Sequence, residues 1–273
     1  MNKDRYAVMG NPIAHSKSPQ IHALFATQTA EQLSYEAIHV EADGFNAAVS
    51  QFQQAGGKGL NVTVPFKQEA WHLVGKRSDR AELAGAVNTI MIGADGALFG
   101  ENTDGQGLVT DLTANHDLKI KNSKILIVGA GGAVRGVLAP LLTCHPESIT
   151  IANRTLSRAE ELARTFTSFG DVRVSSFADL EGQTFDLIVN GSAASLQGEV
   201  PPLPDSIVDQ NCCYDMMYGE KPTPFMVWAA GLGAKHTIDG LGMLVEQAAE
   251  SFYLWRGVRP ETAAVIAEIR RKL

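Results

Sequence analysis

The stretch KILIVGAGGAVRG, residues 124–136, decides the fold. Its first part is an apolar, β-branched run typical of a buried strand, and its glycines lead into the helical pattern AVRGVLAPLL. Gly129 and Gly131 fit the first two positions of G-x-G-x-x-G, and Val134 stands at the third. Gly129 allows a tight turn, Gly131 lets the backbone approach a pyrophosphate, and the helix that begins near Ala133 directs its free N–H groups at that anion. A dinucleotide site is therefore favoured over a purely structural turn.

Strands and helices continue to alternate after this turn. SITIAN (148–153), VRVSS (172–176) and FDLIVN (185–190) are predicted strands, and LSRAEELARTF (156–166) is a predicted helix. Together with the stretch 124–136 they form a βαβαβ series, which is typical of a doubly wound, Rossmann-type α/β domain.

The residues after the second of these strands indicate which dinucleotide is bound. An NAD enzyme usually carries Asp or Glu there, to bind the ribose hydroxyls. This chain has Asn153, Arg154 and Thr155, with Arg158 one turn further on. Two guanidinium groups would hold a 2′-phosphate by charge-assisted hydrogen bonds, whereas a carboxylate would repel it. This local positive charge, in a chain of net charge −7, favours NADP.

The first part of the chain also alternates between strand and helix patterns. Ser18 is expected to cap the first helix, with Pro19 at its first helical position. The alternation predicts a parallel sheet with crossover helices. The expected strands are 6–10, 35–40 and 59–64, and the expected helices are 18 to about 32, 45–56, a stretch after Pro65, and 242–255 and 260–273 near the C-terminus.

Composition and charge exclude several classes of protein. The 273 residues are 45% apolar and 19% charged, an ordinary globular balance for two domains. No apolar run approaches the roughly 20 residues of a membrane-spanning helix, and the net charge of −7 argues against a nucleic-acid partner. The three cysteines show neither metal-ligand spacing nor a disulfide pattern, so we expect no metal, a reduced cytoplasmic location and small, buried thiols.

Polar side chains gather after the predicted strands of the first part. HSKSP (15–19) follows the first strand, and NVTVPFK (61–67) ends the third. AGAVNT (84–89) and ENTDG (101–105) come next. Because ligands of open α/β sheets bind at the carboxyl ends of the strands, at least the first two groups should line one rim.

These stretches resemble the shikimate dehydrogenase family. The matching motifs are GNPIAHSKSP, GLNVTVPFK, AGAVNT, ENTDG, GAGGAVRG, NRT, DMMY and DGLGMLVEQAA, in this order from residue 10 to residue 249. The resemblance implies reversible, NADPH-dependent reduction of 3-dehydroshikimate to shikimate in the pathway to aromatic amino acids. It also implies two domains, with the final helices returning to the first. We expect an α/β substrate domain at 1–103 plus 240–273 and a Rossmann-type NADP-binding domain at 104–239.

The resemblance implies roles for residues at matching positions. Lys67 and Asp104 would be the catalytic pair, and Lys67 would act either as the proton donor or mainly as an electrostatic stabiliser. Ser16 and Ser18 would bind the substrate carboxylate. Met216 and Gly240 would lie beside the nicotinamide. The other substrate-binding residues would be Asn61, Thr63, Asn88, Tyr218 and Gln247, joined by the catalytic pair, and the cofactor-binding residues would be Asp79, Gly129, Ala130, Gly131, Gly132, Ala133, Asn153, Arg154, Thr155, Arg158, Met216 and Gly240.

Several of these residues have a structural alternative. Ser18 and Asp104 could each cap a helix. Asn61 could cross-link loops, Lys67 could be a solvated charge, and Gln247 could be a satisfied core amide. The segment that begins Gly191-Ser192 departs from the family, which often has N-A-T-S or N-G-T-S here, so a contact to the cofactor could differ.

Three other functions compete with the leading one. A quinate/shikimate dehydrogenase would accept quinate and could use NAD, and the arginines at 154 and 158 favour the NADP enzyme over it. A folate dehydrogenase of similar plan fits the SKSP and NTDG motifs poorly. A regulator that senses NADPH without turnover would not need Lys67 and Asp104. The sequence leaves the oligomeric state open, with a homodimer as one candidate.

Overall fold

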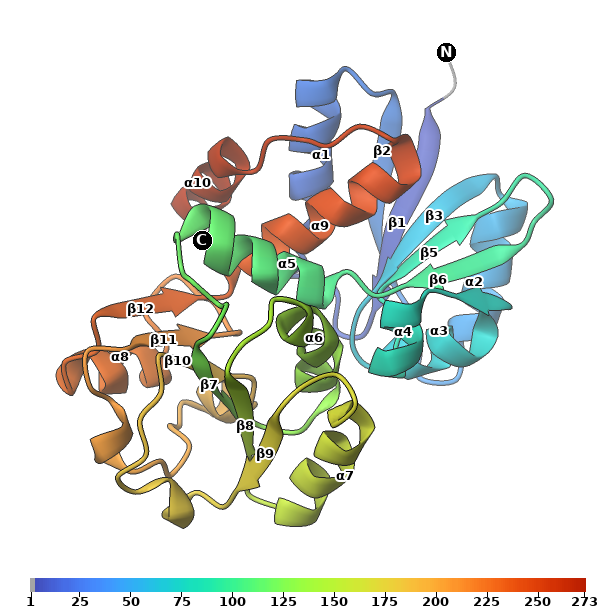
Figure 1. Cartoon of the computed structure of the whole chain (residues 1–273). Coiled ribbons are helices and arrows are strands. Elements are labelled where there is room, and N and C mark those ends of the chain that lie inside the picture. The colour runs from blue at the N-terminus through green and yellow to red at the C-terminus, as the bar shows by residue number, and fades with distance from the viewer. Residues whose placement is uncertain (1–2) are drawn as a thin grey trace. The chain divides into compact units, whose positions relative to one another are not determined.

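The computed structural model describes residues 3–273, and the chain divides into two compact units (Figure 1). Unit 1 contains the residues up to Gly107 together with Leu244–Lys272. Unit 2 contains Leu108–Met243 and Leu273. One unit is thus built from both ends of the chain and the other from its middle.

Both boundaries between the units fall inside helices. The first lies in α5 (Asp104–Thr110) and the second in α9 (Leu241–Arg256). The domain boundaries expected from the sequence, at residues 103/104 and 239/240, lie at the beginning of these same two helices. The chain therefore passes from unit to unit through helices and not through loops.

Unit 1 contains one six-stranded sheet with helices on both faces. Ala7 and Met9 of β1 belong to the apolar core that includes Phe45 and Phe66. Tyr6, on the other face, stacks on Trp255 of α9 with ring centroids 4.7 Å apart. The sheet order is β2-β1-β3-β5-β6-β4. The elements are β1 (Asp4–Gly10), α1 (Ser18–Thr29), β2 (Leu33–His39), α2 (Phe45–Gln54), β3 (Gly57–Val62), α3 (Lys67–Leu73), β4 (Lys76–Arg77), α4 (Asp79–Ala84), β5 (Thr89–Ile92) and β6 (Leu98–Glu101).

The sheet of unit 1 is mixed, and the expectation of a parallel sheet is wrong for its second half. Strands β1, β2 and β3 pair in parallel, but β5 runs antiparallel to both β3 and β6. The reason is the short turn between β5 and β6, where Gly93 and Ala97 are hydrogen-bonded and Gly96 has φ +81°. So short a connection can only join antiparallel strands.

This antiparallel hairpin decides which loops meet at one edge of the sheet. Asn61 at the end of β3 pairs with Thr89 at the start of β5, and Thr89 pairs with Glu101 at the end of β6. The residues after β3, before β5 and after β6 therefore emerge at the same edge. These are the NVTVPFK, AGAVNT and ENTDG segments.

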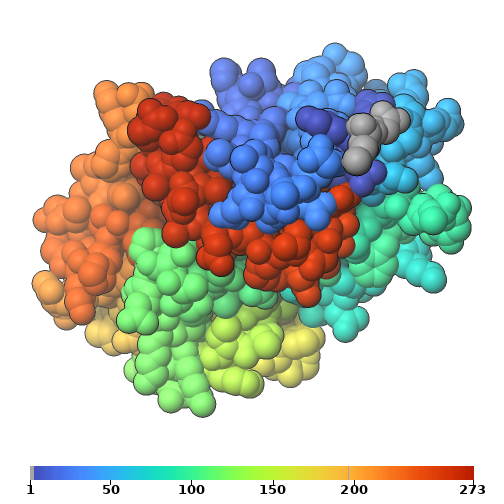
Figure 2. All heavy atoms as spheres, turned by 90° about the horizontal axis from the view of Figure 1, so that it is seen from above, coloured from blue at the N-terminus to red at the C-terminus, as the bar shows by residue number. Residues whose placement is uncertain are grey.

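The C-terminal helices complete unit 1. Arg256, at the end of α9, is hydrogen-bonded to Glu31 and pairs with Asp4 at 2.5 Å. Gln28 of α1 and the backbone of Glu261, just before α10 (Ala263–Arg271), exchange two hydrogen bonds. Figure 2 shows the C-terminal segment, in red, lying directly against the N-terminal segment, in blue. Segments more than two hundred residues apart thus form one core.

The start of α1 differs from the expected one. Lys17 already has near-helical dihedral angles (φ −84°, ψ −8°) and is the N-cap residue, so Ser18 is inside the helix. The prediction that Ser18 caps this helix is therefore wrong. The Ser18 backbone N–H instead donates to the Ser16 hydroxyl, with a separation of 3.3 Å.

Unit 2 contains a six-stranded sheet whose order is β12-β11-β10-β7-β8-β9 and whose strands are all parallel. Counted from β7, this is the 3-2-1-4-5-6 order of a dinucleotide-binding fold. Each of β8, β10 and β11 is buried along its whole length, as expected for strands with helices on both faces. The elements are β7 (Lys124–Val128), α6 (Gly132–Thr143), β8 (Ser148–Ala152), α7 (Leu156–Phe166), β9 (Val172–Ser175), β10 (Leu187–Asn190), β11 (Cys212–Asp215), α8 (Pro224–Gly231) and β12 (His236–Asp239).

The expected strands and helices of unit 2 agree with the structure within one or two residues. Strands β11 and β12 and helix α8 were not expected. Cys212 and Cys213 are buried on β11, as predicted, but Cys144 is only partly buried because it follows the last residue of α6. Among the described residues, no helix is long and apolar enough to cross a membrane.

His22 of α1 is a fully buried histidine. It stacks on Tyr35 with ring centroids 4.1 Å apart, and neither ring nitrogen finds a hydrogen-bond partner among the described residues. Burial lowers its pKa from 6.5 to about 3, because a charged imidazole would lose its hydration. Below pH 6.5 the unfolded chain therefore takes up a proton that the folded chain does not. The stability of the protein falls accordingly as the pH drops from 6.5 toward 3.

We expect the substitution His22→Phe to remove this part of the acid sensitivity. Between pH 6.5 and pH 5 the original protein should lose about 1–2 kcal/mol of unfolding free energy through His22, and the variant should not. Denaturant unfolding at the two pH values measures the difference. His72→Phe, at an exposed position of α3, is the control and should keep the original pH dependence. An unchanged pH dependence in His22→Phe would contradict the prediction.

Candidate functional site

An ion pair stands at the edge of unit 1 where the loops meet. Lys67 begins α3 and Asp104 begins α5, and Lys67 Nζ lies 2.6 Å from Asp104 Oδ2. Their side chains are 29% and 13% exposed, so the pair is partly shielded but still open to a ligand. The Asp104 backbone N–H donates to Asn102 Oδ1 at 3.1 Å, which fixes the start of α5.

Asn88 fixes the other oxygen of this carboxylate. It is 2% exposed, and its Nδ2 donates to Asp104 Oδ1 at 2.8 Å and to Thr103 Oγ1 at 2.9 Å. Its Oδ1 accepts the Thr103 backbone N–H at 2.9 Å. With one oxygen held by Asn88 and the other by Lys67, the carboxylate has a single orientation.

Gln247 and Ser251 of α9 reach the same cluster. Gln247 Nε2 donates to the Leu244 carbonyl at 2.7 Å, and its Oε1 lies 3.4 Å from Asn88 Nδ2. The Ser251 hydroxyl is fully buried and lies 2.8 Å from the Thr89 hydroxyl. The structure thus brings Lys67, Asn88, Asp104 and Gln247, four of the predicted site residues, into one cluster, and their roles stay predictions.

Asn61 is close to this cluster, but its side-chain amide is hydrogen-bonded to other protein groups. Its Oδ1 accepts from the Tyr35 hydroxyl at 2.7 Å, and its Nδ2 donates to Ser251 Oγ at 3.0 Å and to the Asn88 carbonyl at 3.2 Å. It is 6% exposed. These bonds make Asn61 a cross-link between β3, the loop before β5 and α9.

Three further predicted substrate residues follow β1 and β3. Ser16 is partly buried and Ser18 is buried, and they are joined by the hydrogen bond described above. Thr63 is partly buried, and its backbone N–H donates to the Met9 carbonyl at 3.0 Å. Since β1 and β3 are parallel neighbours, all three residues lie at their shared carboxyl edge.

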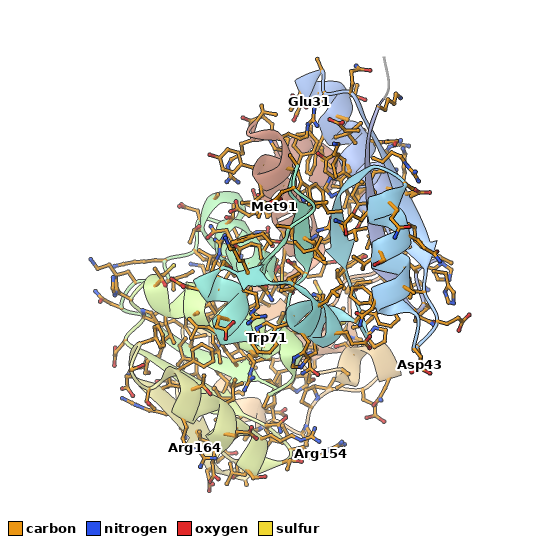
Figure 3. The ribbon with its side chains drawn as sticks, turned by 90° about the vertical axis from the view of Figure 1, so that its right-hand side faces the viewer. Glu31, Asp43, Trp71, Met91, Arg154 and Arg164 are labelled. Atoms are coloured by element: carbon orange, nitrogen blue, oxygen red, sulfur yellow. The ribbon has the colours of Figure 1, made fainter. Side chains whose placement is uncertain are left out.

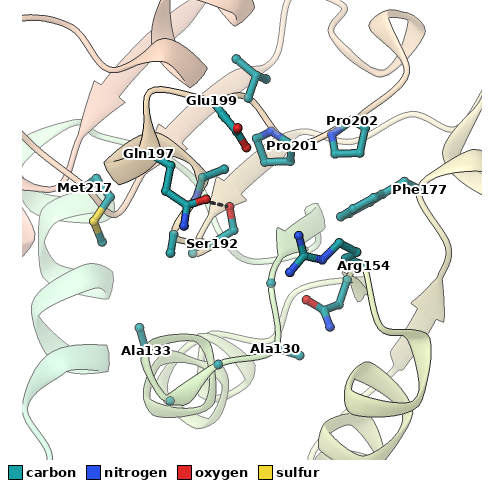
Figure 4. A pocket seen from close by; sticks show the side chains of 18 residues that line it. Ala130, Ala133, Arg154, Phe177, Ser192, Gln197, Glu199, Pro201, Pro202 and Met217 are labelled. Atoms are coloured by element: carbon teal, nitrogen blue, oxygen red, sulfur yellow. Dashed lines mark hydrogen bonds between the residues drawn. The ribbon is translucent and has the colours of Figure 1, made fainter. Parts of the chain in front are cut away.

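A cavity of about 440 Å³ opens in unit 2 where the strand order reverses between β7 and β10 (Figure 4). This is the place at which a doubly wound sheet binds its ligand. The lining residues are Gly129, Ala130, Gly131, Gly132, Ala133, Asn153, Arg154, Phe177, Gly191, Ser192, Ala193, Ala194, Gln197, Glu199, Val200, Pro201, Pro202 and Met217.

The glycine-rich loop is shaped for a ligand that contains phosphate. Gly129 has φ +113°, and a Cβ there would lie 3.2 Å from the backbone of Gly191, so the turn requires glycine. At Gly131 and Gly132, by contrast, a Cβ would meet no described atom within 4 Å. The absence of these side chains therefore leaves open space in the cavity, beside the N-terminus of α6. Such space and the free N–H groups of the helix fit the pyrophosphate of a dinucleotide.

The predicted cofactor residues after β8 divide into two groups. Asn153 and Arg154 line the cavity, whereas Thr155 and Arg158 do not. Asn153 Nδ2 donates to the Thr155 carbonyl at 2.9 Å, which closes the turn before α7. Figure 4 shows the Arg154 guanidinium directed into the cavity, between Phe177 and the glycine-rich loop. Arg158 is exposed on α7.

Met216 and Gly240 lie against each other, and neither lines the cavity. A Cβ at Gly240 would collide with the Met216 carbonyl oxygen, so the close approach of the residues that follow β11 and β12 requires glycine. Met217 lines the cavity, and Met216 is 7% exposed with its sulfur near Gly191. Tyr218 follows, and burial, with a smaller effect of Asp239, raises the pKa of its phenol.

Asp79 is the remaining predicted cofactor residue. It is exposed at the first position of α4 in unit 1, and its contact with a cofactor stays a prediction. Within residues 3–273 no group of three or more His, Cys, Asp or Glu side chains could hold a metal ion.

Sequence reasoning missed several cavity residues. The segment that begins Gly191-Ser192 was expected to affect a cofactor contact but was not given a site role. It follows β10, the neighbour of β7, so the strand order was a signal that could have assigned both residues to the cavity. Phe177, Pro201 and Pro202 come from irregular segments with no motif, and only the folded chain brings them to the cavity.

Comparison with known proteins agrees with this geometry. Models of three families match: "Shikimate dehydrogenase substrate binding domain" at residues 8–90, "Shikimate / quinate 5-dehydrogenase" at 112–197 and "Shikimate 5'-dehydrogenase C-terminal domain" at 240–270. The shikimate dehydrogenase (NADP(+)) of Hahella chejuensis is 59% identical over 269 residues, which are 98% of this chain and 99% of the relative.

Solved structures give the same result. An Ael1 enzyme from Pseudomonas putida superposes with a TM-score of 0.94 and 47% identity, over 97% of this chain and 98% of that one. Shikimate 5-dehydrogenase from Thermus thermophilus, in complex with NADP(H) and shikimate, has a TM-score of 0.89 and 32% identity over 99% and 100% of the two chains. With the glycine-rich cavity in unit 2, the Lys67–Asp104 pair in unit 1 and relatives alike along their whole length, the chain belongs to the shikimate dehydrogenase family.

Proposed function

We propose that the protein is an NADP-dependent shikimate dehydrogenase, which reversibly reduces 3-dehydroshikimate to shikimate in aromatic amino acid biosynthesis. The observation that carries the proposal is the Lys67–Asp104 pair, 2.6 Å apart and held in one orientation by the buried amide of Asn88. A nucleotide-sensing regulator has no use for a cation and a carboxylate positioned in this way. The pair is suited to a reaction in which charge develops on a substrate oxygen.

Carbonyl reduction requires a hydride on carbon and a proton on oxygen. NADPH, when bound, supplies the hydride. Lys67 Nζ would face the developing alkoxide, and would either deliver the proton or mainly stabilise the negative charge. Asp104 Oδ2 orients the ammonium group, and the carboxylate can also accept a hydrogen bond from a substrate hydroxyl. The reverse reaction uses the same groups in the opposite order.

The residues around the two sites would bind the other parts of the ligands. Ser16 and Ser18 would hold the substrate carboxylate with their hydroxyls, and Thr63, Asn88, Tyr218 and Gln247 would contact its ring hydroxyls. Asn61 would shape this pocket through its cross-links. In unit 2, the α6 N-terminus would bind the pyrophosphate and Arg154 the 2′-phosphate, with Arg158 and Thr155 nearby. Met216 and Gly240 would lie beside the nicotinamide. A cytoplasmic location and a homodimer stay predictions.

The assay that tests the proposal measures NADP reduction by absorbance. Shikimate and quinate are each supplied with NADP and with NAD. Turnover confined to shikimate with NADP supports the proposal. Comparable turnover with quinate or NAD would make the protein a quinate/shikimate dehydrogenase, and NADPH binding without turnover in all four mixtures would make it a regulator.

Replacement of Lys67 should abolish most turnover. Lys67→Met keeps an unbranched chain of similar length but removes the charge and the proton, so kcat should fall roughly 10²- to 10⁴-fold, while the affinity for NADP stays unchanged. Steady-state kinetics and a fluorescence titration with NADPH measure the two quantities. Lys76→Met, at an exposed position of β4, is the matched control. Near-normal turnover in Lys67→Met would disprove the assigned role.

Replacement of Arg154 should weaken the preference for NADP over NAD. Arg154→Gln removes a charged donor that would bind the 2′-phosphate, so the KM for NADP should rise roughly ten- to hundredfold with little change in the KM for NAD. Arg164→Gln, in the last turn of α7, removes an exposed guanidinium from the same unit and is the control (Figure 3). Equal effects on both cofactors would argue against a phosphate contact.

A methyl group at Gly131 should disturb the cofactor and not the fold. Gly131 has extended backbone (φ −86°, ψ −179°), and its Cβ would meet no described atom. Gly131→Ala should therefore change the Tm by only a few degrees but weaken NADP binding by roughly tenfold or more. Gly231→Ala, at the equally open end of α8, should leave both unchanged. Calorimetric melting and titration would show whether the two effects separate.

A further inference from the structure

Asp215, the last residue of β11, is a fully buried carboxylate on which four donors converge. Its Oδ1 accepts from Asn190 Nδ2 at 3.2 Å and from the Met217 backbone N–H at 3.0 Å. Its Oδ2 accepts from the hydroxyls of Ser195 and Thr223, each at 2.6 Å. Such complete pairing is what makes a buried carboxylate tolerable. Sequence reasoning assigned Asp215 no role, although it opens the DMMY motif.

Two of the donors fix the segment that follows β10. Ser195 lies in the 3-10 turn Ala194–Gln197 and is tied directly to Asp215. Asn190 holds the beginning of the segment, because its Oδ1 accepts the backbone N–H of Ser192 at 3.1 Å and the Ser192 hydroxyl at 2.7 Å. Asp215 therefore holds this segment directly at Ser195 and, through Asn190, at Ser192.

The other two donors fix the segment that follows β11. Met217 and Thr223 stand on either side of the loop that carries Tyr218. The Thr223 hydroxyl also accepts the Met226 backbone N–H at 3.3 Å, which caps α8. One carboxylate thus joins two loops that have no strand pairing with each other.

Both loops form the wall of the cofactor cavity. Ser192, Gln197 and Met217 line it, whereas Asp215 does not. Figure 4 shows these three side chains across the cavity from Ala130 and Ala133 of the glycine-rich loop. A shift of either loop would change the width of the cavity without disturbing the parallel sheet behind it.

We propose that Asp215 is a positioning residue, which sets the affinity for NADP by holding these two loops at the correct distance from the glycine-rich loop. The proposal rests on the proposed function only in that NADP is the ligand of the cavity. The carboxylate acts through Ser195, Asn190, Met217 and Thr223 and touches no ligand itself.

The geometry distinguishes between two replacements of Asp215. Asparagine can keep Oδ1 as the acceptor for the two N–H donors, and its Nδ2 can face the hydroxyls of Ser195 and Thr223, which can rotate to accept. Alanine leaves all four donors without their acceptor. Asp215→Asn should therefore restore most of what Asp215→Ala loses.

The test measures the dissociation constant of NADP by calorimetric titration, well below the Tm of each variant. Asp215→Ala should raise this constant by roughly tenfold or more, Ser195→Ala by roughly three- to tenfold, and Asp215→Asn by less than about threefold. Asp111→Ala is the matched control. It removes another fully buried carboxylate of unit 2, which is bonded to Tyr214 at 2.7 Å and is not part of the cavity wall. It should lower the Tm and leave NADP binding unchanged.

A purely structural role for Asp215 would give a different pattern. In that case Ser195→Ala would bind NADP as the original protein does, and Asp215→Ala, where it folds, would affect binding no more than Asp111→Ala. Either result overturns the proposal. The proposed function fails separately, because its failure would appear in the original protein as absent NADP binding or absent turnover of shikimate.

Discussion

A buried side-chain amide has to make its hydrogen bonds to protein atoms, and Asn88 makes its bonds to the groups that form the candidate active site. Its Nδ2 holds Asp104, and its Oδ1 holds the backbone at Thr103. The geometry of the Lys67–Asp104 pair therefore depends on the position of Asn88. Asn88 stands directly before β5, so its position depends in turn on the antiparallel hairpin β5–β6 and its register with β3.

The first four strands of unit 2, with helices α6 and α7, could be predicted from the sequence. These strands are short and apolar, and a glycine-rich turn follows the first of them. The local sequence pattern therefore predicts the same doubly wound fold that the strand order shows. The same pattern found Gly129, Gly131 and Arg154, and the structure places all three at the cavity. The later strands β11 and β12 were not predicted. Their sequences, CCYD and HTID, are only four residues long and show no alternation of apolar and polar residues that would distinguish them from a loop.

Unit 1 was harder to predict because its organisation depends on contacts between distant segments. The residues of the site could be named from their motifs, but the local sign that β5 reverses the direction of the sheet, the short turn that contains Asp95-Gly96, was overlooked. The role of Asn61 illustrates the difficulty, since its bonds to Tyr35 and Ser251 join segments 26 and 190 residues away. Phe177, Pro201 and Pro202 were missed for a similar reason, because irregular chain reaches a cavity through tertiary packing alone.

The discontinuous make-up of unit 1 has a consequence for the order in which the protein is made. All of unit 2 except Leu273 is one continuous run of chain and can fold as soon as Met243 has left the ribosome. The first part of unit 1 is synthesised before unit 2 but lacks α9 and α10 until unit 2 has been made. Tyr6 can stack on Trp255, and Asp4 and Glu31 can pair with Arg256, only after these helices have emerged. Unit 1, whose synthesis begins first, is therefore completed after unit 2. Until then the face of its sheet that α9 covers is exposed, and loss of α9 would also remove Gln247 and Ser251 from the cluster around the Lys67–Asp104 pair.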